Sequence, residues 1–549
     1  MRGRQVLMET LKAHGVEKIF GNPGTTESPL IDSLVDYPDI EYIVALHEGV
    51  AVGAASHYAQ ASGQTGFVNV HVAPGLGNAI GMIYGALKAN SPVVVTAGQQ
   101  DTRARLHEPV LGHDLVAMAA PVVKWSVQVE NADELGPILR RAFKIANQAP
   151  AGPVFVALPI NMMEQETDVM ATAPDGIFDA TAPNAAGVAD MAAILAGAEK
   201  PVIIAGDTVG RTGASDALVA LAECVGAEIW HELLHMQASY PNQHASARGP
   251  LPGDSVGIAK ALEGADAVLM VGGAFFEDVW FADGVYFPTT AKVMQIEESA
   301  ETLAHKHAVD IGLIGSLPAT LTAVRNAVGK SSAAAAARNE KLSQEKTAEL
   351  EGQKSRAERS WDRRPASMPR VMQEIENARP PNSIIVDESI TASIDLAKTL
   401  KVNGPGDYYG ARGGGIGQGV AGALGVAVAQ RDRPILAITG DGSAMYSIQA
   451  FWTAAHHDLA IVFVVLRNRE YRVLKHNLDA YRQRFDVPSN KPYSHMNLDG
   501  PDLGYVEMAA GMGLAGARVE DPDDLAAAIK TAFASGKPYV LEVAIEGKR

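Results

Sequence analysis

Residues 434–471 read PILAITGDGSAMYSIQAFWTAAHHDLAIVFVVLRNREY and contain the strongest structural signal in the chain. An apolar run at 434–439 ends at a Gly-Asp-Gly turn, and a second apolar run follows at 459–466. The segment between the two runs is long enough for a crossover helix. Strand, helix and strand in this order predict a βαβ unit, which lays the two strands parallel and brings their carboxyl ends to one edge of a sheet.

Two polar residues follow these strands and are therefore expected to converge. Asp441 follows the first strand, and Asn468 comes 27 residues later, after the second. Mg²⁺ prefers oxygen ligands and bridges to phosphates through one or two carboxylates. Asp441 would supply the charge, while the Asn468 amide and the backbone carbonyl of Glu470 would supply neutral oxygens. The sequence predicts a magnesium site here, with Gly442 allowing a diphosphate to approach the backbone.

An ordinary Asp-Gly turn is the alternative interpretation of this motif. The chain has 53 glycines, so a Gly-Asp-Gly turn by itself says little. The prediction of a metal site depends on strand, turn, helix, strand and asparagine arriving in that order.

The whole chain alternates short apolar runs with amphipathic segments, which is typical of parallel α/β sheets. Its 549 residues are too many for one hydrophobic core and suffice for about three domains. We predict three doubly wound parallel-sheet domains, at residues 1–170, 185–330 and 366–549. Between them, residues 171–187 are rich in alanine and proline and indicate a linker. Residues 331–365 are polar and rich in alanine, lysine and glutamate, and predict a surface helix or linker.

Composition narrows the class of protein. The formal net charge of −17 argues against a nucleic-acid-binding surface. Cys224 is the one cysteine, so the chain has neither an intrachain disulfide nor a cysteine-based metal site, which fits a reducing cytoplasm. The apolar run at 459–466 is far too short to cross a membrane. We therefore expect a cytoplasmic protein with no nucleic-acid or membrane partner.

Six segments are similar to motifs of one enzyme family. They are FGNPGTTE (20–27), ALHEGVAVGAA (45–55), NVHVAPGLGNA (69–79), TAGQQ (96–100), VKWS (123–126) and GDGSAMYS (440–447). Through them nearly the whole chain resembles the benzoylformate decarboxylase group of thiamine-diphosphate-dependent enzymes. The resemblance implies a pyrimidine-binding domain at 1–170, a central Rossmann-like domain at 185–330 and a diphosphate-binding domain at 366–549. It also implies thiamine diphosphate and Mg²⁺ as cofactors.

One departure from the family motif is visible. The motif usually ends in two asparagines, whereas here Arg467 precedes Asn468. The asparagine at the metal-ligand position is retained, so the resemblance still implies Asp441, Asn468 and Glu470 as the metal-binding residues.

Three side chains are candidates for the chemistry by this resemblance. Glu48 matches the glutamate that hydrogen-bonds the aminopyrimidine ring, and burying a glutamate is costly without such a partner. A helix N-terminal acid is the alternative. His71 matches a histidine that handles protons on the substrate side, with a structural loop histidine as the alternative. Thr25 stands where the decarboxylase has a serine that contacts the substrate carboxylate, and a helix N-cap at Thr25 or Thr26 is the alternative.

The resemblance also implies contacts to the cofactor and the substrate. Ile416 matches a bulky residue that bends the cofactor, and the carbonyl of Gly414 would meet the aminopyrimidine ring. Trp280 stands where the decarboxylase has its second catalytic histidine, which weakens benzoylformate as the substrate. The implied cofactor contacts are Asn22, Pro23, Gly24, Asn78, Gly414, Ile416, Gly442, Ser443 and Tyr471. The implied substrate contacts are Thr25, His71, Trp280, Val473, Leu474 and Asn477.

Positive charge follows the metal-binding turn at Arg472, Lys475 and His476, in a chain that is otherwise acidic. In one interpretation these residues lie on the solvated face of a helix and balance nearby acids. In the other, Lys475 or Arg472 meets an anionic group of the substrate beyond its 2-oxo acid carboxylate.

The leading function implied is a nonoxidative decarboxylase that converts a 2-oxo acid into an aldehyde and CO₂. A carboligase or lyase, or an acetolactate-synthase-like enzyme that uses the same enamine intermediate, is the alternative. A noncatalytic protein that kept the fold is a third, and FAD in the central domain is left open. In the family, domains of different subunits meet around each cofactor, so the resemblance implies a homodimer as the minimal active unit and a homotetramer as the expected assembly.

Overall fold

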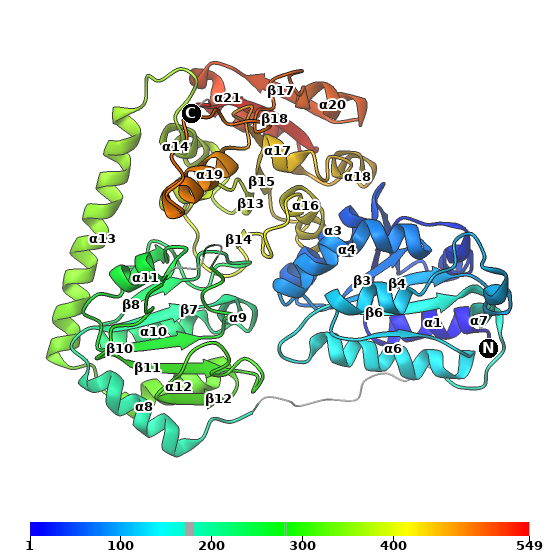
Figure 1. Cartoon of the computed structure of the whole chain (residues 1–549), viewed down its shortest axis with the longest axis horizontal. Helices are drawn as coiled ribbons and strands as arrows, with labels where there is room; N and C mark the ends of the chain where they lie inside the picture. The colour runs from blue at the N-terminus through cyan, green and yellow to red at the C-terminus, as the bar shows by residue number, and fades with distance from the viewer. Residues whose placement is uncertain (171–180, 279, 281–282, 548–549) are drawn as a thin grey trace. The chain divides into compact units, whose positions relative to one another are not determined.

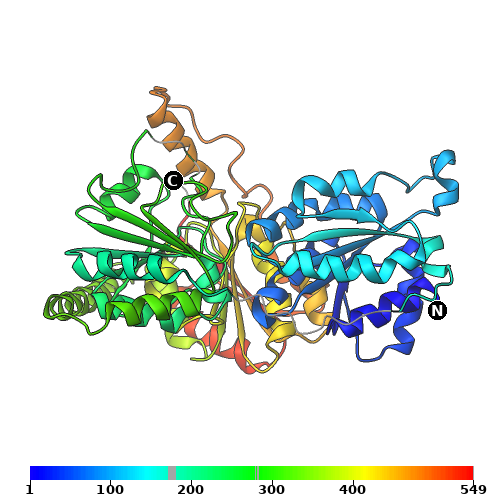
Figure 2. The same cartoon turned by 90° about the horizontal axis from the view of Figure 1, so that it is seen from below.

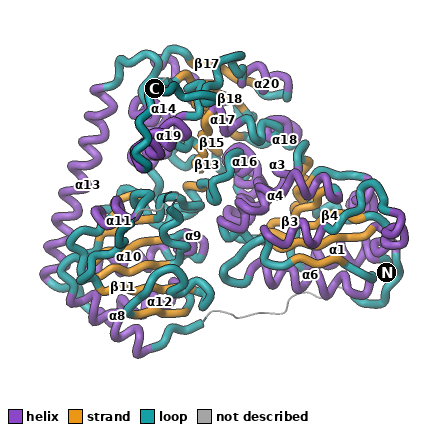
Figure 3. The backbone as a smooth tube through the Cα atoms, viewed as in Figure 1, coloured by secondary structure: helices purple, strands orange, loops and turns teal. Residues whose placement is uncertain are grey.

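The computed structural model describes residues 1–170, 181–278, 280 and 283–547. The predicted linker at 171–187 lies mostly outside these residues. The chain forms two compact units. Unit 1 comprises Met1–Ile177, Trp361–Ile394 and Ala411–Arg549, and unit 2 comprises Phe178–Ser360 and Asp395–Gly410. Three six-stranded sheets with parallel strands and flanking helices (Figures 1 and 3) confirm the predicted α/β class.

The N-terminal sheet belongs to unit 1 and has the strand order β2-β1-β3-β4-β6-β5. Its strands are β1 (Lys18–Gly21), β2 (Glu41–Val44), β3 (Gly66–Val70), β4 (Val93–Gln99), β5 (Ser126–Gln128) and β6 (Val154–Pro159). Helices α1 (Gly3–Ala13) and α6 (Ala132–Asn147) bury apolar residues against one face, where Ile19, Phe67 and Val94 lie. Helices α3 (Glu48–Ser62) and α4 (Val72–Lys88) cover the other face (Figures 1 and 2). Both sheet faces are therefore buried, as parallel sheets require.

The central sheet belongs to unit 2 and has the order β12-β11-β10-β7-β8-β9. Its strands are β7 (Pro201–Ala205), β8 (Glu228–His231), β9 (Ala247–Pro250), β10 (Ala267–Val271), β11 (Lys292–Glu297) and β12 (Ile311–Ile314). Alternate residues of β7 face opposite sides. Ile203 packs with α8 (Ala185–Gly197), α10 (Ser215–Val225) and α12 (Leu317–Val328), whereas Ile204 packs with α11 (Ser255–Ala261).

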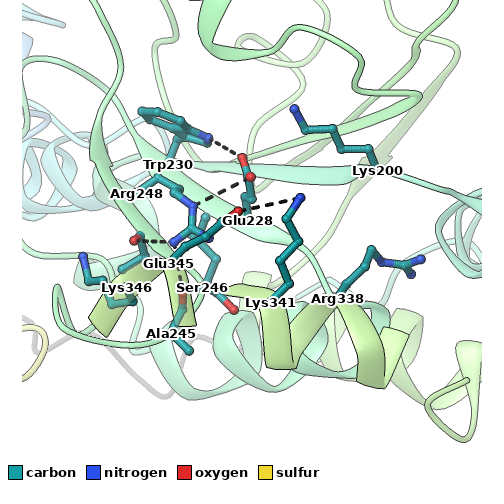
Figure 4. Close-up of polar contacts among 12 residues, drawn as sticks. Lys200, Glu228, Trp230, Ala245, Ser246, Arg248, Arg338, Lys341, Glu345 and Lys346 are labelled. Atoms are coloured by element: carbon teal, nitrogen blue, oxygen red, sulfur yellow. Dashed lines mark hydrogen bonds and ion pairs between the residues drawn. The ribbon is translucent and has the colours of Figure 1, made fainter. Parts of the chain in front are cut away.

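The polar segment predicted as a surface helix or linker forms helix α13 (Ala333–Arg359) of unit 2. Polar contacts attach it to the edge of the central sheet, as Figure 4 shows around Arg248. The Arg248 guanidinium lies 3.0 Å from Glu345 of α13 and 3.7 Å from Glu228 of β8. Trp230 Nε1 donates to the same Glu228 at 3.3 Å. These contacts and the apolar residues Ala335 and Leu342 hold a helix whose other side chains are mostly exposed.

The C-terminal sheet has the order β14-β13-β15-β16-β18-β17. Its strands are β13 (Ile384–Glu388), β14 (Tyr408–Tyr409), β15 (Ile435–Gly440), β16 (Ile461–Arg467), β17 (Ala515–Val519) and β18 (Tyr539–Ala544). Strands β15 and β16 pair in parallel from Ile435–Ile461 to Gly440–Leu466. The short helices α17 (Asp441–Ala444) and α18 (Ala450–His456) make the crossover between them. The predicted βαβ unit is confirmed to within two residues at each strand end.

Within unit 1, helices α3 and α16 (Gln418–Ala429) pack at very short distance because both carry small residues at the contact. A Cβ atom on Gly425 would overlap the Ala54 carbonyl and lie 2.7 Å from the Tyr58 nitrogen. A Cβ on Gly422 would meet the His57 ring at 2.5 Å. Gly422 and Gly425 of α16 are therefore required by the packing of α16 against α3. No helix in the described part of the chain is long and apolar enough to cross a membrane.

We expect Gly425→Ala to lower the free energy of unfolding by about 1–3 kcal/mol, because the added methyl group has no space against backbone atoms of α3. Gly352→Ala in the exposed helix α13 is the control, since nothing lies within 4 Å of its Cβ position. Alanine there should be neutral or raise stability by up to about 1 kcal/mol. Thermal unfolding of the two variants checks this, and equal behaviour of both would contradict the packing argument.

Candidate active site

Glu48 lies just beyond the carboxyl edge of the N-terminal sheet. It is the first residue of α3, and His47 caps this helix by accepting a hydrogen bond from the Gly49 nitrogen at 3.0 Å. The Glu48 residue is 6% exposed. Its Oε1 accepts from Asn22 Nδ2 at 3.2 Å, and its Oε2 accepts from Asn78 Nδ2 at 3.0 Å. The structure thus brings three predicted site residues together, and neutral amides rather than a cation hold the carboxylate.

His71 follows β3 and precedes α4, and a buried carboxylate orients its ring. His71 Nδ1 lies 2.8 Å from Glu27 Oε2, and the Glu27 side chain has no exposed area. The Glu27 carboxylate also accepts from the Gly24 nitrogen at 3.1 Å and the Gly98 nitrogen at 2.9 Å. A carboxylate can only accept, so the proton shared with it lies on Nδ1 and leaves Nε2 available for exchange.

Sequence reasoning assigned no site role to Glu27 and missed this contact. Glu27 and His71 are 44 residues apart, so spacing gave no signal. The structure also differs from the alternative in which Thr25 or Thr26 is a helix N-cap. Gly24 caps the 3₁₀ turn Thr25–Glu27, and Glu27 caps the helix that follows. The N-cap alternative is therefore wrong, and the Thr25 side chain is exposed beside the His71–Glu27 pair.

The glycine turn before Thr25 lies directly against the His71 ring. A Cβ on Gly24 would overlap that ring, so only glycine fits at this position. Asn22 is half-buried and Pro23 is exposed. The segment 22–25 therefore links the two parts of the site: Asn22 contacts Glu48, and Gly24 lies against the His71 ring.

Asp441 and Asn468 converge at the carboxyl edge of the C-terminal sheet, as the crossover predicts. Asp441 Oδ1 accepts from the Gly442 nitrogen at 2.8 Å, and Oδ2 accepts from the Arg469 nitrogen at 2.7 Å. Asn468 Oδ1 accepts from the Glu470 nitrogen at 3.0 Å. Burial raises the pKa of Asp441 to about 6, although these backbone donors oppose the shift. Asp441 is thus a desolvated carboxylate without a side-chain partner at its oxygens, which fits a metal ligand.

The donor set suits a metal ion that is coordinated partly by the protein and partly by the oxygens of a diphosphate. Among the described residues no group of three or more His, Cys, Asp or Glu could hold a metal ion. One carboxylate, one amide and backbone carbonyls are what Mg²⁺ uses when substrate or cofactor oxygens complete its octahedron. Ser443 is buried in α17, and the Tyr471 ring lies against Gly442, where a Cβ would be 2.9 Å from Cδ1.

A glycine loop precedes α16 and contains two further predicted residues. Gly414 has φ +72 and is exposed, and Ile416 is half-buried. Glu388 at the end of β13 anchors the start of α16, because its carboxylate accepts from the nitrogens of Gln418 and Gly419, each at 3.0 Å. Burial raises the pKa of Glu388 to about 8. Sequence reasoning did not identify Glu388, which lies 30 residues before its partner.

The raised pKa of Glu388 predicts a pH dependence of stability. Between about pH 4.5 and 8 the folded protein holds a proton that the unfolded chain releases, so stability falls as pH rises through this window. Glu388→Gln removes this group. From pH 5 to pH 9 the wild type should therefore lose on the order of 3–5 kcal/mol more unfolding free energy than the variant does. Denaturant unfolding at both pH values checks this, with exposed Glu358→Gln as the control, and a constant difference would contradict it.

Helix α19 (Arg472–Arg484) holds the residues predicted beside the substrate. Leu474 is 43% exposed, while Val473 and Asn477 are half-buried. Lys475 is buried, and its ammonium lies 2.5 Å from Glu470 Oε2 and 2.9 Å from Asn497 Oδ1.

The interpretation that Lys475 lies on a solvated helix face is therefore wrong, although the residue does balance a nearby acid, Glu470. Arg472 Nε also reaches Glu470, at 3.0 Å from Oε1. The Glu470 side chain thus pairs with both cations, while its backbone carbonyl is the predicted metal ligand. His476 is exposed. Neither Arg472 nor Lys475 is a free charge for a substrate anion.

Trp280 lies in unit 2, between β10 and β11, and is half-buried. Two histidines of unit 2 lie elsewhere: the His231 and His235 rings are in contact, tilted by 56° at a centroid distance of 4.1 Å. Burial lowers the pKa of His231. The assignment of Trp280 to the substrate pocket stays a prediction.

The buried Glu48 and Asp441 carboxylates and the Gly-Asp-Gly turn at 440–442, at the carboxyl edges of parallel sheets, fit an α/β protein that binds a phosphate-containing ligand. Family descriptions match three parts of the chain: the thiamine pyrophosphate enzyme N-terminal TPP binding domain (residues 1–118), central domain (188–324) and C-terminal TPP binding domain (391–543). The chain belongs to the thiamine pyrophosphate enzyme family.

Individual relatives cover nearly the full length. Benzoylformate decarboxylase of Pseudomonas aeruginosa is 32% identical over 539 residues, which are 97% of each chain. Acetolactate synthase isozyme 2 large subunit of Escherichia coli is 27% identical and covers 100% of this chain and 96% of its own. The structure of the thiamine diphosphate-dependent 4-hydroxybenzoylformate decarboxylase of Rhodococcus jostii RHA1 superposes with a TM-score of 0.87 at 26% identity, covering all of both chains.

Proposed function

We propose that the chain is a thiamine-diphosphate- and Mg²⁺-dependent nonoxidative decarboxylase of a 2-oxo acid, releasing an aldehyde and CO₂. The observation that carries this proposal is the buried Glu48 carboxylate, held by Asn22 and Asn78 with no cation at its oxygens. A carboxylate buried with only two neutral donors is costly, and a ligand that hydrogen-bonds it would offset this cost. The similarity to two decarboxylases of aryl 2-oxo acids supports the reaction class.

In this proposal Asp441, Asn468 and the Glu470 carbonyl hold Mg²⁺, and Gly442 and Ser443 at the start of α17 receive the diphosphate. Asn22, Pro23, Gly24, Asn78, Gly414, Ile416 and Tyr471 are the further cofactor contacts. When bound, thiamine diphosphate would supply a carbon nucleophile for the substrate carbonyl and an electron sink for the bonding pair that remains when CO₂ leaves.

The protein's own groups bind the substrate and move protons. Glu48 exchanges a proton with the cofactor's pyrimidine ring, while the two asparagine amides fix the direction of its carboxylate. His71 exchanges protons with the substrate through Nε2, because Glu27 holds the proton on Nδ1. The exposed Thr25 hydroxyl beside His71 binds the substrate carboxylate, and Val473, Leu474 and Asn477 of α19 contact the rest of the substrate.

A panel of 2-oxo acids tests the reaction class. We expect CO₂ release with formation of an equimolar aldehyde, and the preferred member among aryl, alkyl and branched acids identifies the substrate. A carboligase or lyase is the second candidate, favoured by the similarity to an acetolactate synthase subunit. CO₂ release with a hydroxyketone in place of the aldehyde would support it. No CO₂ from any member would contradict the proposed decarboxylase.

We further propose that Glu48 and Asp441 of different subunits share one cofactor, so that a homodimer is the minimal active unit and a homotetramer the working assembly. Exposed Leu106 and Val110, which are 93% and 95% accessible, fit a surface covered by a second copy. Light scattering at assay concentration should show a dimer or larger particle. A fully active monomer would contradict the shared site.

A further inference from the structure

Arg467 is the residue at which the chain departs from the family motif, and it is buried. It ends β16, directly before the predicted metal ligand Asn468, and its side chain is 6% exposed. A buried guanidinium next to a divalent-cation site is unfavourable for two reasons: the guanidinium loses its hydration, and its charge repels the metal ion. The structure must therefore contain a group that offsets this charge.

Glu542 on β18 is that group. Val465 of β16 pairs with Glu542 in register, and residues two apart on a strand share a face, so Arg467 and Glu542 lie on the same side of the sheet. Arg467 Nε lies 2.9 Å from Glu542 Oε1, and Glu542 has no exposed area. Arg467 also contacts the more exposed Glu520, and Arg518 Nε donates to Glu542 Oε1 at 2.9 Å.

The same carboxylate reaches the metal-binding turn from a second direction. Glu542 Oε2 accepts from the nitrogens of Tyr505 and Val506, at 3.0 and 3.3 Å, where α20 (Tyr505–Gly511) begins. Tyr505 is fully buried, and its hydroxyl donates to the backbone carbonyl of Asp441 at 2.5 Å. Contacts therefore run from Arg467 through Glu542 and Tyr505 to Asp441, and they connect the two turns that hold the proposed metal ligands.

We propose that Glu542 is a positioning residue for the metal site: it neutralises Arg467 beside Asn468 and holds Tyr505, which fixes the Asp441 turn. The proposal rests on the proposed function, because it assumes that Asp441 and Asn468 bind Mg²⁺. It also explains how the structure accommodates the arginine that replaces the family's asparagine, because the buried Glu542 and the more exposed Glu520 both offset its charge.

A purely structural role for this network has different consequences. In that case each substitution lowers stability, and two substitutions together cost at least as much as one. Charge balance instead predicts that removing the carboxylate harms metal binding, and that removing the arginine as well restores it. The test is therefore a double-mutant cycle read out as metal affinity.

Apparent Mg²⁺ affinity is measured by calorimetric titration of thiamine diphosphate into the apoprotein at a series of Mg²⁺ concentrations. Glu542→Gln keeps an acceptor for the Tyr505 nitrogen but leaves Arg467 with only the more exposed Glu520 to offset its charge. We therefore expect the apparent dissociation constant for Mg²⁺ to rise about tenfold or more. In Arg467→Met/Glu542→Gln it should return to within about threefold of wild type. Arg518→Met, at a partly exposed position, is the control and should change it less than about twofold.

Tyr505→Phe tests the second branch with a milder change. Loss of the hydroxyl bond to the Asp441 carbonyl should weaken Mg²⁺ binding about three- to tenfold, while melting of the apoprotein stays close to wild type. Unchanged Mg²⁺ affinity in Glu542→Gln, or a double variant that binds Mg²⁺ no better than Glu542→Gln, would overturn the proposal. The proposed function would still stand in either case, provided that the wild-type protein binds Mg²⁺ and thiamine diphosphate. A wild-type protein that binds neither Mg²⁺ nor thiamine diphosphate would overturn both.

Discussion

Asp441→Ala is expected to raise the dissociation constant for thiamine diphosphate in the presence of Mg²⁺ by about 100-fold or more. Asp441 is the one carboxylate in the proposed metal set, and the hydrogen bonds that its oxygens accept from the described residues come from backbone N–H groups. Removing it takes away the charge that offsets dehydration of the metal. Calorimetry with thiamine diphosphate and saturating Mg²⁺ measures the effect.

Two controls separate metal binding from folding in this experiment. Burial raises the pKa of Asp441 to about 6, so its charge destabilises the apoprotein above that pH and its removal should not lower the melting temperature. Asp458→Ala, at an exposed residue that pairs with Lys537, should leave cofactor affinity unchanged. An Asp441→Ala variant that binds the cofactor as tightly as wild type would remove Asp441 from the site.

Mg²⁺ affinity should also depend on pH through this group. The metal binds the carboxylate and not the carboxylic acid, so affinity should fall as pH drops through about 6. The direction follows from the raised pKa, because protons compete with the metal over a range in which an ordinary aspartate is already charged.

The second large effect is expected for Glu48→Gln, which should lower kcat by about 100-fold or more while cofactor affinity stays within a few fold of wild type. The amide keeps the size and one acceptor of the carboxylate, so the contact with Asn22 or Asn78 can persist. It cannot exchange a proton, and proton transfer by a positioned group contributes about 10²–10⁴-fold to rate.

Steady-state kinetics and cofactor titration together test this role of Glu48. Glu17→Gln, an exposed glutamate of the same domain, is the matched control and should be kinetically silent. Loss of cofactor affinity with unchanged kcat at saturation would instead indicate that Glu48 acts in binding.

The sequence predicted the parts of the molecule that depend on local pattern. Apolar runs of strand length placed β15 and β16, and the rule that parallel strand ends share an edge placed Asp441 near Asn468. The resemblance placed Glu48 with Asn22 and Asn78, whose contacts to Glu48 the structure shows.

The contacts that the sequence did not predict join distant parts of the chain through buried charges. Glu27 holds His71, and Glu542 holds Arg467, across 44 and 75 residues. No spacing rule connects such pairs, because each depends on which strand lies next to which. Lys475 was assigned either to a solvated helix face or to contact with a substrate anion, whereas Glu470 of the metal-binding turn supplies a buried partner five residues away.

The most direct test of the account is hydrogen–deuterium exchange at the thiazolium carbon of thiamine diphosphate bound to the wild-type protein with Mg²⁺. If Glu48 activates the cofactor, exchange should be orders of magnitude faster in the complex than for the free cofactor, and Glu48→Gln should bring it back toward the free rate. Exchange in the wild-type complex that is no faster than in solution would contradict the assignment of a thiamine-dependent catalyst and favour a protein that only binds the cofactor.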